Sequence, residues 1–175
     1  LLAKANSLEE EGIGVAGTRF TYAVGTLVLW SADPELAGSD CRSVLDSLGK
    51  RRLAIANPVT APYGAAAQAF LRQADLWDAV EGNLVFGQNI AQTLQFVATR
   101  NASIGLVAAS QLHSPQLPDA TCQWPVPAEL HPPIEQQAIL LTAARGNDVA
   151  TAFLEFIRGP QGRAIIEAQG YGVPD

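Results

Sequence analysis

Two segments match motifs that carry chemistry in other proteins, but both lie in the wrong structural setting. Residues 12–17 read Gly-Ile-Gly-Val-Ala-Gly and fit GxGxxG, which binds a dinucleotide only between a preceding strand and a following helix. Here a helical segment comes first and a strand-like segment follows, so the pattern predicts a flexible turn. Residues 47–50 read Ser-Leu-Gly-Lys and fit the SxxK spacing of Ser–Lys acyl enzymes, but no SDN or KTG partner accompanies them. We expect a helix C-terminus there.

The titratable side chains offer little else for catalysis. His113 and His131 lie in a Pro-rich segment without a carboxylate or Cys at catalytic or metal-ligand spacing, and we expect both to be structural or incidental. Asp75 and Asp78 have the spacing of a solvated helix face. Because no nucleophile is paired with a base, we predict that the chain is not an enzyme. The alternative, an α/β hydrolase or transferase, would require Ser47 or His113 for activity.

Two long segments contain no charged residue at all. Residues 53–71 and 82–99 each contain a strand-like run, a tight turn and a helix start. In open α/β sheets, ligands bind beyond the carboxyl ends of the strands, where helix N-termini present unsatisfied N–H groups. The turns at 57–64 and 88–90 could hold a small anion there without a formal counter-charge. Composition alone leaves open the other interpretation, that they are ordinary buried βα turns.

The composition excludes several classes of protein. The chain has 175 residues, 48% hydrophobic and 16% charged, which favours a packed core over disorder. Its net charge is −6 and its basic residues are scattered, apart from Lys50-Arg51-Arg52, so we expect no nucleic-acid partner. The longest apolar stretch, within residues 20–30, is too short to span a membrane. Cys41 and Cys122 show no metal-ligand clustering, and whether they form a disulfide stays open.

The pattern of apolar residues, caps and breakers predicts an α/β fold. Strand and helix alternate between residues 52 and 110, which is typical of βαβ units around a mostly parallel sheet. The expected strands are 18–30, 53–56, 84–86, 104–108, 121–124 and 135–141. The expected helices are 4–11, one capped by Ser39 or Asp40, 62 to about 77, one capped by Asn89, one capped by Asn147, and a last one ending near 170.

The ordered segments of the chain resemble one known family. The segments that carry the likeness are 19–30, 52–58, 61–64, 77–78, 87–90, 104–107, 156–162 and 170–172. In order and spacing they are similar to the molybdate-binding receptors of bacterial ABC transporters, and the likeness covers nearly the whole chain. No single motif is diagnostic, but the ordered set is fairly specific.

The resemblance implies a type II periplasmic-binding-protein fold, in which molybdate or tungstate sits in a cleft between two lobes. It implies that the backbone amides of Tyr63 and Ile90 bind the oxyanion, together with the neighbouring Gly64 and Asn89. Several family members place a ligand-binding Tyr where this sequence has Ala108, so Ser110 is the candidate replacement. The resemblance implies no cofactor and no bound metal ion other than molybdenum within its oxyanion. The partner would be the membrane permease of an ABC importer, and the location periplasmic or membrane-tethered outside the cytoplasm.

The family's first lobe opens with a strand and Ser-rich turns that have no counterpart in this chain. By the resemblance, residues 21–132 form the second, ligand-binding lobe, and residues 1–20 and 133–175 are the remnant of a discontinuous first lobe. The terminal helices carry Phe153, Phe156, Ile165 and Ile166, which would then be exposed. We therefore expect the chain, if it is not accompanied by the N-terminal segment of that lobe, to dimerise or swap elements and to bind molybdate weakly.

Two further alternatives stay open beside the enzyme. One is a receptor of the same fold for another oxyanion such as sulfate, which competition experiments would distinguish. The other is a cytoplasmic sensor domain of this fold, which a DNA-binding module encoded upstream would indicate.

Overall fold

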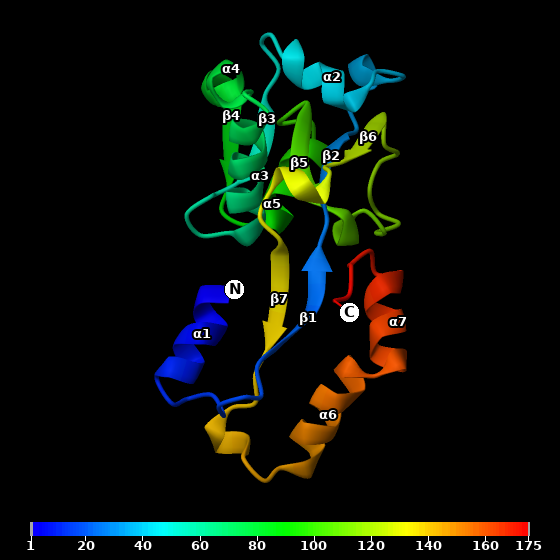
Figure 1. Cartoon of the computed structure of the whole chain (residues 1–175). Helices are drawn as coiled ribbons and strands as arrows, with labels where there is room; N and C mark the ends of the chain where they lie inside the picture. Colours follow the sequence, from blue (N-terminus) through cyan, green and yellow to red (C-terminus); the bar gives the residue numbers. More distant parts are fainter. Residues whose placement is uncertain (1, 175) are drawn as a thin grey trace. The chain divides into compact units, whose positions relative to one another are not determined.

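The computed structural model describes residues 2–174, with side-chain exposure from residue 5 onward, and divides the chain into two compact units (Figure 1). Unit 1 comprises Leu1–Gly25 and Glu135–Asp175, and unit 2 comprises Thr26–Ile134. The boundaries expected for two lobes, 20/21 and 132/133, lie slightly N-terminal to both of these. The chain thus leaves unit 1 once and returns to it once.

Unit 2 is built on a five-stranded mixed sheet. Its strands are β2 (Leu27–Ser31), β3 (Leu53–Ala56), β4 (Leu84–Gly87), β5 (Ile104–Ala108) and β6 (Cys122–Pro125), in the order β4-β3-β5-β2-β6. β3 pairs in parallel with β4 and β5, whereas β2 pairs antiparallel with β5 and β6. The sheet is mixed, but β3, β4, β5 and β6 share one direction and β2 runs against them, so the expectation of a mostly parallel sheet is confirmed with β2 as the exception. The strand–helix alternation generates the three hydrogen-bonded parallel strands. β6 follows β5 through a long irregular connection and lies on the far side of β2, antiparallel to β2.

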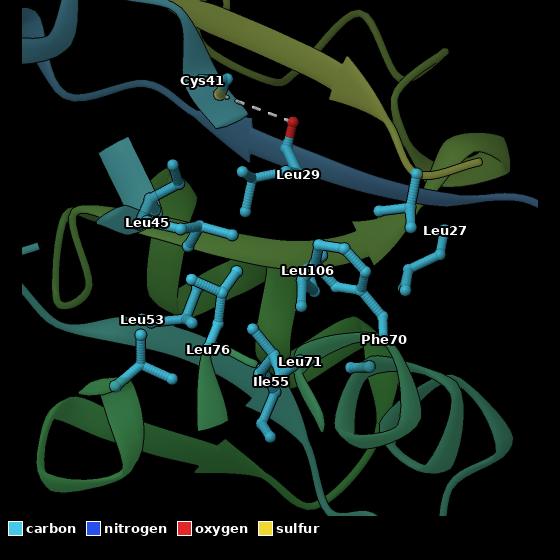
Figure 2. Close-up of a cluster of buried hydrophobic side chains, with 14 of the residues drawn as sticks. Leu27, Leu29, Cys41, Leu45, Leu53, Ile55, Phe70, Leu71, Leu76 and Leu106 are labelled. Atoms are coloured by element: carbon cyan, nitrogen blue, oxygen red, sulfur yellow. Dashed lines mark hydrogen bonds between the residues drawn. The ribbon is translucent and has the colours of Figure 1, made fainter. Parts of the chain in front are cut away.

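The central strands are buried on both faces, which explains their nearly continuous apolar sequences. Side chains alternate between faces. Leu27 and Leu29 of β2 enter the larger core cluster, and Val28 and Trp30 enter the smaller one. Figure 2 shows the larger cluster, where Phe70 and other apolar side chains of the covering helices meet those of the strands.

The helices of unit 2 cover this sheet. They are α2 (Cys41–Asp46), α3 (Pro62–Gln73), α4 (Trp77–Val80) and α5 (Ile90–Ala98), with short 3₁₀ turns at Pro34–Leu36, Glu81–Asn83, Ala109–Gln111 and Ala128–Leu130. The expected helix over 62–77 is in fact two, because Asp75 between them adopts a positive φ of 56° that a right-handed helix cannot contain. Asp40 and Asn89 cap α2 and α5 through their side-chain oxygens, as the sequence predicts.

Unit 1 contains α1 (Leu2–Glu10), β1 (Phe20–Gly25), β7 (Ile134–Ala138), a 3₁₀ turn at Thr142–Ala144, α6 (Asp148–Arg158) and α7 (Pro160–Ala168). β1 and β7 form a separate two-stranded sheet, and Asn147 caps α6 as expected. The expected single strand over 18–30 is wrong. Both halves are extended, but β1 pairs with β7 and β2 pairs within the other sheet, so the strand divides at Thr26. Pairing partners, not local propensity, decide this division.

The glycine-rich segment 12–17 forms the predicted turn between α1 and β1. Glu9, on the last turn of α1, holds the C-terminal end of this glycine-rich segment. The Gly17 N–H donates to Glu9 Oε1 at 2.9 Å, and Arg19 Nε lies 2.8 Å from Glu9 Oε2. These two contacts, the backbone hydrogen bond first, hold the pKa of the Glu9 carboxyl below its ordinary value. The GxGxxG match is thus a connector.

Cys41 and Cys122, whose pairing the sequence left open, form a disulfide with their Cα atoms 5.4 Å apart. They lie at the first residues of α2 and β6 and are separated by 81 positions in the chain. The bond therefore links the helix to the edge strand β6 and closes a long loop of the unfolded chain.

Reduction of this disulfide should lower the free energy of unfolding by about 2–4 kcal/mol, because the cross-link restricts a long loop in the unfolded chain. Urea unfolding with and without reductant measures the change. The double variant Cys41→Ser/Cys122→Ser is the control. Without reductant it should already have the lower stability of the reduced wild type, and reductant should not change its stability further. Equal stability of the wild type under both conditions would contradict this expectation.

Candidate functional site

Two turns meet at the carboxyl edge of the parallel strands in unit 2. β3 and β4 end side by side, with Ala56 opposite Gly87 in the register, and the N–H of Asn57 donates to the Gly87 carbonyl at 2.8 Å. From these neighbouring ends the chain turns into α3 and α5. The two uncharged segments found in the sequence therefore place two helix starts at one edge of one sheet.

The turn before α3 leaves the start of that helix without a side-chain cap. Asn57 folds the turn, because its carbonyl accepts from the N–H of Ala61 at 2.9 Å and its Oδ1 accepts from the N–H of Val59 at 2.9 Å. Ala61 occupies the N-cap position and makes no side-chain cap hydrogen bond. Pro62 has no N–H, so Tyr63 and Gly64 carry the first two amides of α3.

Gly64 sets how closely α3 approaches β3. A Cβ atom at this position would lie 2.3 Å from the Ala56 carbonyl oxygen and 2.6 Å from the carbonyl of Asn57. Both neighbours are backbone atoms and cannot move aside as a flexible side chain would. Only glycine allows the first turn of α3 to rest directly on the end of the strand.

The turn before α5 is held by reciprocal side-chain hydrogen bonds. Asn89 Oδ1 accepts from the Gln92 N–H at 2.9 Å, and Gln92 Oε1 accepts from the Gln88 N–H at 2.7 Å. The hydroxyl of Thr93, which is fully buried, donates to the Asn89 carbonyl at 2.9 Å. Ile90 carries the first amide of this helix. The arrangement is a variant of a capping box and fixes the direction of the first amides.

The two residues expected to donate backbone amides are anchored by their side chains. Tyr63 is 7% exposed within the larger core cluster, and Ile90 is partly buried against the same cluster. Their side chains are thus packed inward, and the group that each brings to the edge of the sheet is its main-chain N–H. Neither segment contains a charged side chain, so the charge that these two segments bring to the edge is that of the two helix dipoles.

Ala108 is the last residue of β5 and Ser110 follows that strand, which is parallel to β3 and ends toward the same edge. Ala108 is 1% exposed, and its N–H donates to Gln111 Oε1 at 3.4 Å. Its side chain therefore offers a ligand no donor. Ser110 is half-buried in the 3₁₀ turn Ala109–Gln111 and carries the nearest hydroxyl in the sequence.

The structure gives supporting roles to Asn57 and Gln88, which begin the two predicted turns, and to Gln92 and Thr93, which the sequence analysis did not name. Gln92 had a readable signal, because it stands three residues after the N-cap, the capping-box spacing. The role of Thr93 had no such signal in the sequence, since a threonine inside a helix does not by itself indicate which residue it contacts. Its place is defined by Gly87, where an added Cβ would lie 2.5 Å from the Thr93 hydroxyl.

The residues considered for catalysis are dispersed. Ser47 is the C-cap of α2, as predicted, and its hydroxyl donates to the Ser43 carbonyl at 3.4 Å. His113 is exposed, and His131 is buried with Nδ1 2.8 Å from the Pro132 carbonyl oxygen. Asp75 and Asp78 are exposed, as expected for a solvated face.

Within residues 2–174, no group of three or more His, Cys, Asp or Glu side chains could hold a metal ion. Over the same residues, no helix combines the length and apolar character needed to cross a bilayer.

Known proteins share both the sequence and the fold. The family model described as bacterial extracellular solute-binding protein matches residues 2–172. The molybdate-binding protein ModA of Azotobacter vinelandii is 47% identical over 95% of this chain, and that of Rhodobacter capsulatus is 41% identical over 93%. The chain spans 66% and 62% of the lengths of these two relatives. The solved periplasmic molybdate-binding protein of A. vinelandii superposes with a TM-score of 0.86 at 34% identity, over 99% of this chain and 76% of that one.

Replacement of Gly64 by Ala should destabilise the chain by about 1–3 kcal/mol, because the new methyl group must push α3 away from the backbone at the end of β3. Urea unfolding measures the loss. Gly82→Ala is the matched control, since its Cβ would meet nothing within 4 Å and its φ is not positive. Equal stability of the two variants would show that α3 does not rest on β3 as described.

Proposed function

The chain belongs to the bacterial extracellular solute-binding proteins, and from this membership we propose that it binds molybdate or tungstate at the carboxyl edge of β3, β4 and β5 and delivers it to the permease of an ABC importer. Identity of 47% and 41% to two molybdate-binding proteins over nearly the whole chain supports the ligand class. The observation that carries the site is the meeting of two uncharged helix N-termini at hydrogen-bonded strand ends.

The chemistry of these donors suits a small, fully deprotonated oxyanion. Helix N-termini offer N–H donors and the positive end of a dipole, so they hold negative charge without a basic side chain. Molybdate, tungstate and sulfate carry no proton at neutral pH and need only donors. Phosphate retains a proton that needs an acceptor. A donor-only site therefore disfavours phosphate by its protonation state and separates molybdate from sulfate by size.

In this proposal, the amides of Tyr63 and Gly64 bind from the start of α3, and the amide of Ile90 binds from the start of α5. Asn89 holds the second turn in place through Gln92. The hydroxyl of Ser110 is the candidate donor near Ala108. No cofactor takes part, and molybdenum enters only within its oxyanion. Solute-binding proteins, the class of these relatives, are not enzymes, and the role proposed here is binding alone.

Delivery to a permease places the protein outside the cytoplasm, in the periplasm or tethered to the membrane surface. Unit 2 would be the second, ligand-binding lobe, and unit 1 would represent part of the first lobe. The extracellular description of the family supports the location.

An added carboxylate at the start of α3 tests the site. Ala61→Asp supplies a cap that favours the helix, but its charge takes the place of the anion and should weaken molybdate binding tenfold or more, equivalent to about 1.4 kcal/mol. Ala79→Asp adds the same charge on the exposed face of α4 and is the matched control. Isothermal titration with molybdate measures both, with tungstate, sulfate and phosphate as competitors.

Tungstate alone should compete effectively with molybdate. Displacement by sulfate at comparable concentration would instead favour a receptor for that oxyanion. Unchanged molybdate affinity in Ala61→Asp would contradict the placement of the site at the start of α3. Absence of molybdate binding by the wild-type chain would contradict the proposed function.

We also propose that the chain self-associates through α6 and α7. The structure exposes Val149, Phe153, Phe156 and Ile165 by 79%, 60%, 44% and 56%, while Ile166 is half-buried. Large exposed apolar side chains on one pair of consecutive helices favour association with a second copy. Light scattering should find dimers that Phe153→Glu/Ile165→Glu converts to monomers, whereas a monodisperse wild-type monomer would refute this proposal.

A further inference from the structure

The amino edge of the parallel strands in unit 2 carries four basic side chains. Lys50, Arg51 and Arg52 directly precede β3, and Arg100 lies in the turn before β5. The parallel pairing of β3 with β5 brings these two segments together. The N–H groups of residues 103 and 104 donate to the Arg52 carbonyl at 3.1 and 3.4 Å. Residues about fifty positions apart in sequence therefore form one basic cluster.

The cluster lines a hollow. The four basic residues surround a cavity of about 440 Å³ together with Glu35, Asn101 and Ser103. A second hollow of about 490 Å³ runs along β4 and shares Lys50 and Arg52. The basic side chains thus face open volume at the edge of the sheet.

Little negative charge balances this cluster. Glu35 is the one carboxylate among the residues that line the first hollow; its oxygen lies 3.7 Å from Arg51 Nη2, and its side chain is 78% exposed. A long, solvated ion pair of this kind contributes little. Lys50, Arg52 and Arg100 have no ion pair within the described part of the chain. The cluster is a local excess of positive charge on a chain whose net charge is −6.

Arg51 supplies a second, independent observation. Its Nε atom is buried and has no hydrogen-bond acceptor among the described residues, although the side chain as a whole is 36% exposed. Buried donors are normally satisfied, so such an atom calls for a partner from outside the chain. The guanidinium fork holds its Nε and Nη groups in the geometry that donates to two oxygens of a phosphate group at once.

We propose that this hollow is a second anion-binding site, which binds phosphate groups through the fork of Arg51 and the charges of Lys50, Arg52 and Arg100. The phosphate is borne by a free polyphosphate anion or by a phospholipid headgroup. Recognition here rests on formal charge, in contrast to the neutral donors at the carboxyl edge of the same strands. The two sites are therefore independent, and this one does not rest on the identity of the oxyanion at the other.

Isothermal titration of the full chain with inorganic pyrophosphate tests the free-anion source. Binding should weaken as ionic strength rises, since surface charges are screened by salt. Arg51→Lys keeps the charge but removes the fork, and Arg100→Gln removes one exposed charge; each should lower the affinity several-fold. Arg145→Gln removes the same charge from an exposed position in unit 1 and should leave the affinity unchanged.

Co-sedimentation with vesicles of phosphatidylglycerol, against vesicles of phosphatidylcholine, tests the headgroup source with the same three variants. The proposal is supported if the affinity for either probe is lower in Arg51→Lys and Arg100→Gln but unchanged in Arg145→Gln. The probe that binds identifies whether the phosphate belongs to a free anion or to a lipid headgroup. Absence of binding to both probes, or equal losses in all three variants, overturns it. Molybdate affinity, measured on the same variants, should stay constant, so a failure here is distinguishable from a failure of the proposed function.

Discussion

The parallel pairing of β3 with β4 and β5 is the interaction on which the functional surfaces of unit 2 depend. Parallel strands direct all their carboxyl ends to one edge and all their amino ends to the other. The carboxyl edge receives two uncharged turns and two helix N-termini, and the amino edge receives four basic residues. The parallel pairing of these three strands thus places residues that are far apart in the sequence at two chemically different edges of the sheet.

The two edges would recognise anions by different physical means. Oriented amides act through dipoles fixed by the fold, so their strength depends on how rigidly the helix starts are held. Gly64 and the hydrogen bonds around Asn89 provide that rigidity, which reduces the ordering that binding must otherwise impose. Basic side chains act through formal charge, tolerate imprecise geometry and are weakened by salt. Selectivity belongs to the first arrangement and attraction of highly charged groups to the second.

The proposed recognition by backbone amides would also explain why the candidate site contains few residues of recognisable chemistry. Under the proposal, Tyr63 and Ile90 contribute only their amides, while their side chains pack into or against the core. A different apolar residue of similar size could perform the same task. The informative residues are those that shape the turns: Asn57 through its turn hydrogen bonds, and Gly64 and Gly87 through close contacts that exclude a Cβ atom.

The sequence by itself determined the local features of this protein. The strands 53–56 and 104–108, the caps Asp40, Asn89 and Asn147, and the turn at 12–17 follow from residue type and spacing, because they depend on hydrogen bonds and torsion angles within a few residues. The absence of charge in two segments, together with the ordered resemblance, pointed to an oxyanion receptor. Only the tertiary structure decided that residues 18–30 form two strands, that β2 runs antiparallel to its neighbours β5 and β6, and that Cys41 pairs with Cys122. Only the tertiary structure placed Arg100 and Arg51 around the same hollow and packed Thr93 against Gly87. Each of these depends on which distant segment becomes a neighbour, and that choice is made by burial and pairing over the whole unit rather than by any local preference.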